Sequence, residues 1–470
     1  MPRYLVTALI VACALFMENL DATVISTSLP AIALDLHDDP ISLKLAMTSY
    51  LVSLAVFIPA SGWIADRFGA RNIFRLAIVV FTLGSIFCGF ARDLSELVAA
   101  RVLQGLGGAM MTPVGRLLLL RSVDRADLVR ALSYLTVPAL LGPLAGPLLG
   151  GFITTYFHWR WIFWINVPIG VVGIVLASIY IEDVREEAPW PLDIKGFVYS
   201  GLGLSLLIFG LALAGRGLTR FETTLPLIGL GALSLTAYFF HARRADFPLL
   251  DLRLLAVPTF RAGLTGGSLF RIGVGSIPFL LPLMLQMSFG MTPFQSGSIT
   301  FIGSAGAMLM KTTAAPILRL VGFRRTLVGA ATLSALFLGA YGFFTPATPL
   351  VIMMSALFIS GFVKSLEFTS LNAIAYAEIT PAEMSRAVSF ASVAQQLSLS
   401  LGIAAGAAAL QTAARLNGDA DVFDAENFRW AFLAMGLVSL SSVPTFLSLP
   451  RDAGSELAPR RAKEASQLER

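Results

Sequence analysis

The sequence predicts an all-α integral membrane protein with fourteen transmembrane helices, and two observations lead to this prediction. Of the 470 residues, 56% are hydrophobic and only 13% are charged, whereas a soluble domain has about 25% charged residues. In addition, the chain contains a series of apolar runs of about 20 residues, the length that crosses a bilayer as a helix. Because a soluble fold cannot hide so much apolar surface from water, we expect the chain to lie in a membrane.

The apolar runs fall into groups of six, two and six along the chain. The first six are Tyr4–Leu29, Leu45–Ile64, Ile73–Ala91, Leu97–Leu120, Val129–Tyr156 and Trp161–Ile181. The middle two are Ile194–Ala214 and Thr224–His241. The last six are Phe260–Met287, Pro293–Ala315, Phe323–Phe344, Leu350–Asn372, Ala387–Ala414 and Trp430–Leu449. The first run is too long for a cleavable signal peptide and lacks a small-residue cleavage site, so we expect it to be the first membrane helix.

Two polar segments divide these groups. Residues 182–193 contain Pro189 and Pro191, and residues 242–258 form the second segment. The helix pair between them carries almost no charge, which suits a lipid-facing position. We therefore expect an N-terminal six-helix unit over residues 1–181, linkers and an inserted pair over 182–258, a C-terminal six-helix unit over 259–450 and a tail over 451–470.

The distribution of Lys and Arg predicts the orientation. With the N-terminus inside, the inner segments carry 22 of the 34 Lys and Arg residues, and the outer segments carry 7. Because cytoplasmic loops are enriched in these residues, we expect both termini in the cytoplasm and the protein in the inner membrane of the cell.

Several function classes find no support in the sequence. Cys13 and Cys88 lie inside apolar runs, and His37, His158 and His241 lie in three different loops, so we expect no metal site. There is no nucleophile–base arrangement and no Walker-type phosphate loop, so we expect neither an enzyme nor an ATP-driven pump, and no cofactor. The net charge of +5 is spread over loops, so we expect no nucleic-acid partner.

The first half contains ionisable groups inside its predicted helices. Glu18 and Asp21 are three residues apart and share one helix face. At about 1.5 Å per residue, Asp21 lies about 13 Å below the outer surface, and Arg101 and Gln104 of the fourth run reach an overlapping depth. Because a charge in a membrane helix is costly, one carboxylate near Arg101 is a candidate for proton exchange. The alternative is a buried pair that only holds two helices together.

The second half predicts a substrate cavity with polar anchors among apolar side chains. Arg271 lies near the middle of its run, and Lys364 and Glu367 share one helix face. The predicted cavity residues are Phe270, Arg271, Lys364, Glu367, Asn372, Gln395 and Gln396. Met and Phe side chains at such positions more often serve packing alone. Arg116 and Lys311 lie near the cytoplasmic ends and can extend to the interface.

Two motifs are more specific. The short loop Ser61–Arg75 has the spacing Gly-x-x-x-Asp-Arg-x-Gly-x-Arg, with Gly62, Asp66, Arg67, Gly69 and Arg71 at the defined positions. We expect its glycines to allow a tight turn and close helix contact. The fifth run contains the repeated glycines and prolines Gly142, Pro143, Gly146, Pro147, Gly150 and Gly151, which predict either a packing seam alone or a bendable seam that also limits leakage.

These motifs carry a resemblance to a known family. The Ser61–Arg75 loop resembles the loop between helices two and three of the major facilitator superfamily, and Leu318–Arg324 is a degenerate copy of it in the second half. The Gly142–Gly151 segment resembles the fifth-helix motif of proton-exchanging members. Leu20–Pro30, Arg101–Ala109 and Trp159–Gly170 resemble the first-, fourth- and sixth-helix motifs of the fourteen-helix drug:proton antiporters. The resemblance implies the major facilitator fold of two six-helix bundles, a latch at Asp66, Arg67 and Arg71, and an Arg101 that assists proton transfer.

We therefore expect a secondary transporter that exports small amphipathic drugs or metabolites in exchange for protons, by alternating access. Its partners would be a small-molecule substrate, protons and the lipid bilayer, and a monomer is expected. The alternatives are a proton symporter or a dedicated exporter of a single metabolite or siderophore. Arg271 would suit an anionic substrate, whereas Glu18, Asp21 and Glu367 would suit cations.

Overall fold

The computed structural model describes residues 3–123, 128–181, 191–214, 221–246, 248–380, 383–418, 421–451 and 453–454. Over these ranges the regular secondary structure is helical, without strands. The chain divides into two compact units. Unit 1 comprises Met1–Leu250 and Gly290–Ser298, and unit 2 comprises Asp251–Phe289 and Ile299–Arg470.

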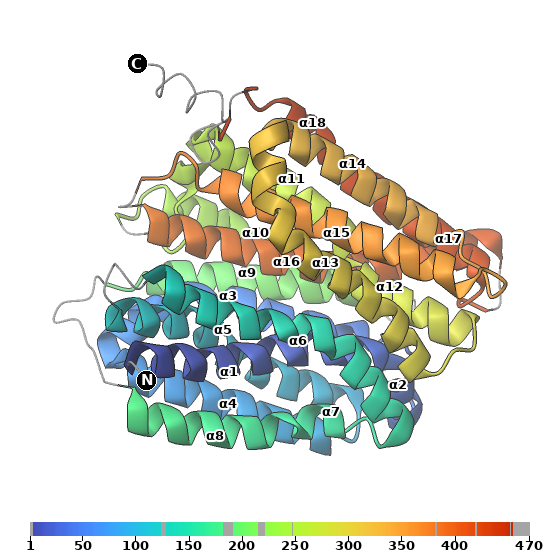
Figure 1. Ribbon diagram of the computed structural model, residues 1–470, viewed down its shortest axis with the longest axis horizontal. Coiled ribbons are helices and arrows are strands. Elements are labelled where there is room, and N and C mark those ends of the chain that lie inside the picture. Colours follow the sequence, from blue (N-terminus) through green and yellow to red (C-terminus); the bar gives the residue numbers. More distant parts are fainter. Residues whose placement is uncertain are drawn as a thin grey trace. The chain divides into compact units, whose positions relative to one another are not determined.

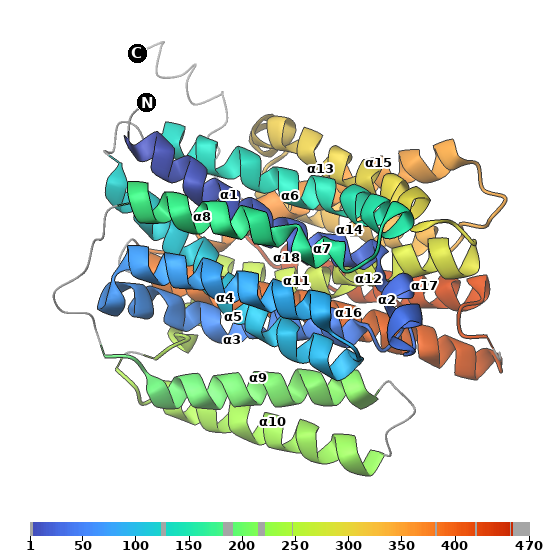
Figure 2. The ribbon, with the colours of Figure 1, turned by 90° about the horizontal axis from the view of Figure 1, so that it is seen from below.

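Unit 1 contains the first ten helices of the chain (Figures 1 and 2). They are α1 (Arg3–Val24), a 3₁₀ turn (Ile25–Thr27), α2 (Leu29–Leu36), α3 (Lys44–Phe68), α4 (Ala70–Phe90), α5 (Leu94–Ser122), α6 (Leu128–Tyr156), α7 (Trp161–Trp164), α8 (Asn166–Tyr180), α9 (Ile194–Ala214) and α10 (Phe221–Ala242). Helix α1 packs along α6, α4 packs along α5, and α3 also lies against α5. Helix α8 packs against α1 and α4, and α1 also contacts α5, so α1, α4, α5 and α8 surround one interior.

The helices of the inserted pair, α9 and α10, lie side by side and contact the rest of unit 1 through α3 (Figure 2). Phe57 of α3 stacks on Phe197 of α9 with ring centroids 5.8 Å apart. In the most apolar stretches of α9 and α10, only 28% and 17% of residues are buried. So large an exposed apolar surface fits the lipid-facing position expected for this pair.

Unit 2 contains the helices that follow residue 250, except for the first turns of α13. They are a 3₁₀ turn (Leu252–Ala256), α11 (Pro258–Gly275), α12 (Ile277–Leu283), a π-helical turn (Met284–Ser288), α13 (Pro293–Val321), α14 (Phe323–Tyr341), α15 (Leu350–Ala375), α16 (Met384–Asn417), α17 (Ala425–Leu440) and α18 (Val443–Leu447). Helix α11 packs against α15, α16 and α17, and α14 packs against α15 and α17. Residues of α13 before Ile299 belong to unit 1.

Each predicted run corresponds to a helix or to a broken helix, but the count of fourteen spans is not confirmed. Among the described residues, twelve helices are long and apolar enough to cross a membrane. The predicted fifth and eleventh runs, now α6 and α14, are not among these twelve. In α14 the arginines Arg324 and Arg325 lie in the first turn and shorten the uncharged stretch. The first span also ends earlier than predicted, at Thr27, which is the last residue of the 3₁₀ turn that follows α1.

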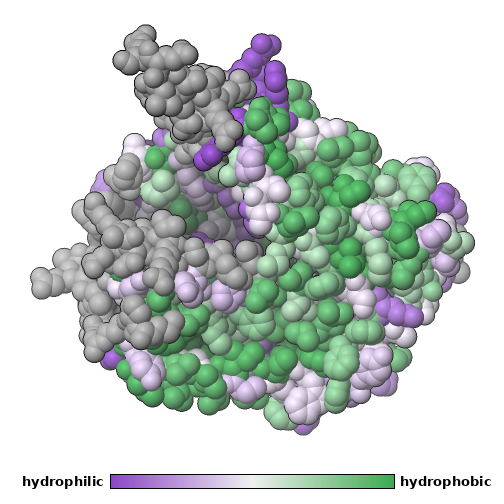
Figure 3. Space-filling model, in the orientation of Figure 1, coloured by the Kyte–Doolittle hydropathy of each residue, from purple (hydrophilic) through white to green (hydrophobic). Residues whose placement is uncertain are grey.

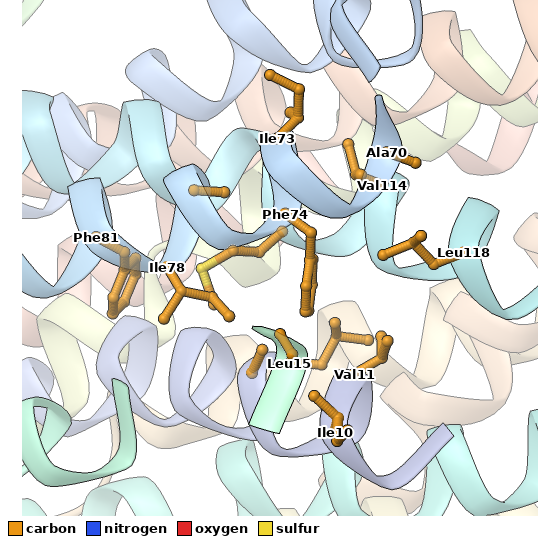
Figure 4. Close-up of a cluster of buried hydrophobic side chains, with 14 of the residues drawn as sticks. Ile10, Val11, Leu15, Ala70, Ile73, Phe74, Ile78, Phe81, Val114 and Leu118 are labelled. Carbon is orange, nitrogen blue, oxygen red and sulfur yellow. The ribbon is translucent and has the colours of Figure 1, made fainter. Parts of the chain in front are cut away.

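The surface and the core both follow from the composition. Hydrophobic residues cover much of the visible surface, and large apolar side chains such as Val171, Ile179 and Leu336 are exposed (Figure 3). The core of unit 1 joins α1, α4 and α5. Phe74 of α4 lies in the middle of this cluster, near Leu15 of α1 and Val114 of α5 (Figure 4). This packed interior holds the polar residues of the same helices in fixed positions.

The two units repeat one connection. Gly69 joins α3 to α4 with φ of 92°, and Gly322 joins α13 to α14 with φ of 84°. Both values favour glycine, since a Cβ is strained there. Two residues later, Arg71 Nη1 donates to the Ile181 carbonyl at 3.2 Å, and Arg324 Nη2 donates to the Leu447 carbonyl at 2.7 Å. The degenerate copy predicted at Leu318–Arg324 therefore shares backbone geometry and an arginine contact with the first loop.

Candidate functional site

A buried carboxylate, Asp21 of α1, is the centre of a polar network inside unit 1. Its side chain is fully buried, and that of Arg101 is 1% exposed. Asp21 Oδ2 accepts a hydrogen bond from Arg101 Nη1 at 2.5 Å. Asp21 Oδ1 accepts from Gln104 Nε2 at 2.8 Å and from Asn166 Nδ2 at 2.9 Å. Three donors, one of them a cation, thus stabilise the ionised carboxylate.

The donors are themselves held by a surrounding set of contacts. Arg101 Nε donates to the Ala46 carbonyl of α3 at 3.1 Å, and Arg101 Nη1 also donates to Gln104 Oε1 at 2.6 Å. The guanidinium carbon lies 4.2 Å from the centroid of the Tyr50 ring, which favours a cation–π interaction. Ser85 Oγ of α4 accepts from Gln104 at 2.6 Å and from Asn166 at 3.0 Å. The network therefore joins α1, α3, α4, α5 and α8.

The structure brings together Asp21, Arg101 and Gln104, as their predicted depths required. The network also contains residues that the sequence did not single out, namely Tyr50, Ser85 and Asn166. Asn166 lies in a run that is otherwise apolar, Trp161–Gly170. An isolated amide in such a run was the available signal, because a buried amide in lipid needs a partner.

Glu18 belongs to a different environment from Asp21. It is half-buried, and its Oε2 accepts a hydrogen bond from the Thr112 hydroxyl of α5 at 2.8 Å. The Tyr50 hydroxyl is buried and has no hydrogen-bond partner in the described part of the chain. A Cβ added at Gly108 would lie 3.1 Å from this hydroxyl and 3.7 Å from Glu18 Cγ. The Tyr50 hydroxyl and Glu18 therefore flank the same glycine, which lies seven residues, or about two helix turns, after Arg101 on α5.

The latch residues lie at the junction of α3 and α4. Gly69 makes the turn, Asp66 and Arg67 lie in the last turn of α3, and Arg71 lies in the first turn of α4. The close helix contact expected at Gly62 is wrong for this structure. Gly62 lies inside α3, and a Cβ added there would meet no described atom within 4 Å. The role of Gly62 in the latch stays a prediction, and the packing around it does not require a glycine.

The glycines of α6 form a packing seam. The helix is continuous over 29 residues although it contains Pro138, Pro143 and Pro147. A Cβ at Gly142 would lie 2.9 Å from the Phe16 carbonyl oxygen, one at Gly146 would overlap the Thr23 hydroxyl, and one at Gly150 would overlap the Val24 carbonyl. These three glycines thus permit backbone contact with α1, the helix that carries Asp21. Gly151 points elsewhere, against the Pro293 carbonyl at the start of α13.

The predicted cavity residues of unit 2 do not share one environment. Phe270, Arg271 and Glu367 are buried, Asn372 is exposed, and Lys364, Gln395 and Gln396 are intermediate. Arg271 Nη2 donates to Asn372 Oδ1 at 3.4 Å. Phe270 and Phe368 stack edge to face, with ring centroids 5.6 Å apart. A shallow hollow of this unit is lined by Ile302, Met354, Ser355, Phe358 and Ile359, and thus by none of the predicted cavity residues.

Two carboxylates outside the spans hold helix ends together. Asp35 accepts from Arg160 Nη1 at 2.6 Å and from Trp159 Nε1 at 3.1 Å. Partial burial raises the pKa of Asp35, but the hydrogen bonds from Arg160 and Trp159 outweigh it and hold the pKa below its ordinary value. Asp251, unlike Asp35, is buried, and it accepts from Arg386 Nη1 at 2.7 Å. Burial raises the pKa of Asp251, but the hydrogen bonds from Arg253 and the charges of Arg253 and Arg386 outweigh it and hold the pKa below its ordinary value.

Comparison with known proteins places this geometry in a family. The profile described as Major Facilitator Superfamily matches residues 11–257 and 263–469. The chain belongs to the major facilitator superfamily. Its helices are therefore those of a multi-pass membrane protein, and the repeated Gly69 and Gly322 turns are one connection in each of its two units.

Relatives within the superfamily match nearly the whole chain. A protein of Shigella boydii serotype 4 named "Putative multidrug resistance protein MdtD" is 36% identical over 462 residues, which is 97% of each chain. A protein of the same name from Pectobacterium carotovorum is 39% identical over 84% of each chain. The protein of that name from Escherichia coli K12 is 36% identical over 97% of each chain.

Solved structures of the superfamily share the fold. A D-xylose–proton symporter has a TM-score of 0.68 at 15% identity and covers 96% of this chain and 98% of its own. The POT family transporter PepTSo has a TM-score of 0.67 at 15% identity, with 96% and 99% of the two chains covered. At such low identity these likenesses show the major facilitator fold alone.

Proposed function

We propose that this protein is a proton-coupled secondary transporter that exports small amphipathic compounds, including drugs, by alternating access. Membership of the superfamily and relatives named as multidrug resistance proteins support drug export. A membrane protein of this kind needs an energy source, and we propose the proton gradient, without a cofactor. We therefore propose that the activity of this protein is transport and not catalysis.

The observation that carries the proton coupling is the network around Asp21. Ionisable groups inside membrane helices are costly, and their usual roles are ion pathways and proton relays. In this conformation Arg101, Gln104 and Asn166 together stabilise the ionised carboxylate. If α1 moves away from these donors, the same carboxylate loses its compensation and binds a proton. Asp21 is therefore the coupling group, Arg101 is the cation that releases its proton, and Glu18 assists.

The glycines of α6 give this movement a structural basis. Because Gly142, Gly146 and Gly150 hold α1 at backbone distance, any bend of α6 moves the helix that carries Asp21. We propose that this seam is the surface along which α1 shifts in the cycle. We further propose that Asp66, Arg67 and Arg71 latch the α3–α4 junction in one state. Coupling then requires that proton and substrate each bind one state better than the other.

The finer topology is part of the proposal. Helices α6 and α14 have 29 and 19 residues, and a helix of about 20 residues spans the bilayer. Counting both as spans restores fourteen, with both termini in the cytoplasm and the protein in the inner membrane. The sequence bias of Lys and Arg supports this orientation.

The test is gradient-driven export from proteoliposomes. Purified protein is reconstituted, a pH gradient is imposed, and movement of ethidium, a fluorescent lipophilic cation, is followed with and without an uncoupler. We expect Asp21→Asn to abolish gradient-driven movement, because the variant has no titratable group at this site. Asp246→Asn, which changes an exposed carboxylate of the same unit, is the matched control and should transport normally. Gradient-driven movement by Asp21→Asn at the wild-type rate would refute the assignment.

A dedicated exporter of one anionic metabolite is the second candidate. It is favoured by Arg271, whose Nε is buried and has no hydrogen-bond partner among the described residues. A panel of cationic dyes and anionic compounds, tested in a strain without its own drug pumps, separates the two. Accumulation that changes only for anions would favour the second candidate.

A further inference from the structure

A second carboxyl group buried inside a membrane helix, Glu367 of α15, lies in unit 2 without a hydrogen-bond partner in the described part of the chain. Its side chain is 0% exposed, and neither Oε1 nor Oε2 has a partner among the residues that the structure describes. This is the opposite of Asp21, whose two oxygens accept three hydrogen bonds. An ionised carboxylate that is buried without donors is unfavourable by several kcal/mol or more, whereas a neutral carboxyl group is far less costly.

The packing of α11 on α15 places Arg271 at the level of Glu367. A Cβ at Gly263 would lie 2.8 Å from Ala375 Cβ, and one at Gly267 would lie 3.5 Å from Leu371 Cδ2. The two helices are therefore antiparallel at this contact: a residue four positions later on α11 faces a residue four positions earlier on α15. The next step of the same register pairs Arg271 with Glu367, and the two groups interact electrostatically.

Nevertheless, Arg271 does not form an ion pair with Glu367 in this conformation. The guanidinium turns back along α11, so that a Cβ at Gly267 would lie 2.7 Å from Nη1. Nη2 donates to Asn372 Oδ1 at 3.4 Å, and the guanidinium carbon lies 5.5 Å from the Phe368 ring centroid. Arg271 is therefore held by a long hydrogen bond and a ring contact, and not by the carboxyl group at its own level.

The other neighbouring elements offer Glu367 no strong partner. On α15 itself, Lys364 is one turn away and half-buried. On α13, which also packs against α15, Lys311 Nζ donates instead to the Thr369 hydroxyl of α15 at 2.8 Å. On α14, Tyr341 is hydrogen-bonded to Ser360 of α15. Helices α14 and α15 are antiparallel. Because Ser334 lies seven residues before Tyr341 and Glu367 lies seven residues after Ser360, Ser334 and Glu367 are at the same level along the two helices. The Ser334 hydroxyl is also buried and without a partner in the described ranges.

We propose that Glu367 is a second proton-binding group, protonated in this conformation, and that Arg271 is its partner in another. When the carboxyl proton leaves to water, the guanidinium turns from Asn372 to the carboxylate and forms the missing ion pair. Uptake of a proton reverses both steps. The contribution of this switch to export rests on the proton coupling proposed above, whereas the protonation of Glu367 itself does not.

The test measures the carboxyl group directly on purified full-length protein in lipid. Infrared difference spectra between acidic and alkaline buffer report the C=O stretch of a protonated carboxyl group, which moves on exchange into D₂O. We expect a band from a buried carboxyl group in the wild type and in Asp21→Asn, and loss of that band in Glu367→Gln. Glu378→Gln is the matched control, because Glu378 is an exposed residue near the end of the same unit's α15.

The role of Arg271 has its own readout. In Arg271→Gln the band should persist to more alkaline pH, by about one pH unit or more, because the ionised form has lost its cationic partner. If Glu367→Gln fails to fold, as judged by size-exclusion elution, Glu367→Asp replaces it and should shift the band rather than remove it.

An unchanged band in Glu367→Gln, or no such band in the wild type, overturns the proposal. These outcomes are distinct from a failure of the proposed function, in which gradient-driven export is absent although the Glu367 band is present.

Discussion

The ion pair between Asp21 and Arg101 allows a quantitative prediction, because both side chains are almost completely buried. Two unit charges about 4 Å apart attract by about 4 kcal/mol at an effective dielectric constant of about 20. Removing one member of a buried pair costs about 3 to 5 kcal/mol, since the other charge remains without compensation. We expect Asp21→Asn and Arg101→Gln each to lie at the lower end of this range. In each variant the remaining charge keeps other hydrogen bonds.

Those remaining bonds can be named. In Asp21→Asn, Arg101 still donates to the Ala46 carbonyl and to Gln104 Oε1. In Arg101→Gln, Asp21 still accepts from Gln104 and Asn166. The double variant leaves neither charge, so its loss of stability should be smaller than the sum of the two single losses by about 2 to 3 kcal/mol.

The assay is a double-mutant cycle on the free energy of unfolding, measured by denaturant titration in mixed micelles. The matched cycle combines Arg101→Gln with Asp246→Asn, an exposed carboxylate that should show no coupling. If the Asp21 and Arg101 losses add to within about 0.5 kcal/mol, the two charges do not compensate each other, and the reasoning fails.

Three further changes have expected outcomes. Gly146→Ala should cost about 1 to 3 kcal/mol in thermal unfolding, because its Cβ overlaps the Thr23 hydroxyl, whereas Gly62→Ala should change stability by less than about 0.5 kcal/mol. Asp251→Asn should destabilise by about 1 to 2 kcal/mol near neutral pH. Because the folded pKa of Asp251 is lowered, this difference should persist above the unfolded pKa of about 4 and vanish as the pH falls through the folded pKa. Tyr50→Phe should keep the stability of the wild type, and Tyr50→Leu should lose about 1 kcal/mol of cation–π stabilisation; both are read from the same unfolding titration.

The positions of the helices could be predicted largely because lipid imposes a simple rule on the sequence. Each span must satisfy its own backbone, so apolar runs of about 20 residues mark helices. The rule fails where helices break. It did not give the 3₁₀ turn at Ile25–Thr27 or the π-helical turn at Met284–Ser288. The first turn contacts α6 and the second contacts α17, and hydropathy does not record such contacts between distant segments.

The sequence predicted only those residues of the candidate site that are charged or lie next to a charged residue in an apolar run. Asp21, Arg101 and Gln104 were found because charges in apolar runs are rare and their depth can be counted. Ser85 and Asn166 were missed, because a neutral polar side chain can bond to its own helix and so carries a weak signal. At Gly62 the motif predicted a close approach that the described structure does not contain.

Comparison of the two buried carboxyl groups clarifies what the sequence could not decide. Both Asp21 and Glu367 lie inside apolar runs, and each has an arginine at its level on a neighbouring helix. In unit 1 the arginine reaches the carboxylate at 2.5 Å, whereas in unit 2 it bonds instead to Asn372 at 3.4 Å. Since an arginine side chain has several rotatable bonds, the pairing is set by conformation and not by sequence position. The proton affinity of a buried carboxyl group depends on whether donors or a cation compensate its charge, so the unpaired Glu367 and the paired Asp21 represent a protonated and an ionised condition between which a coupling carboxyl group would alternate.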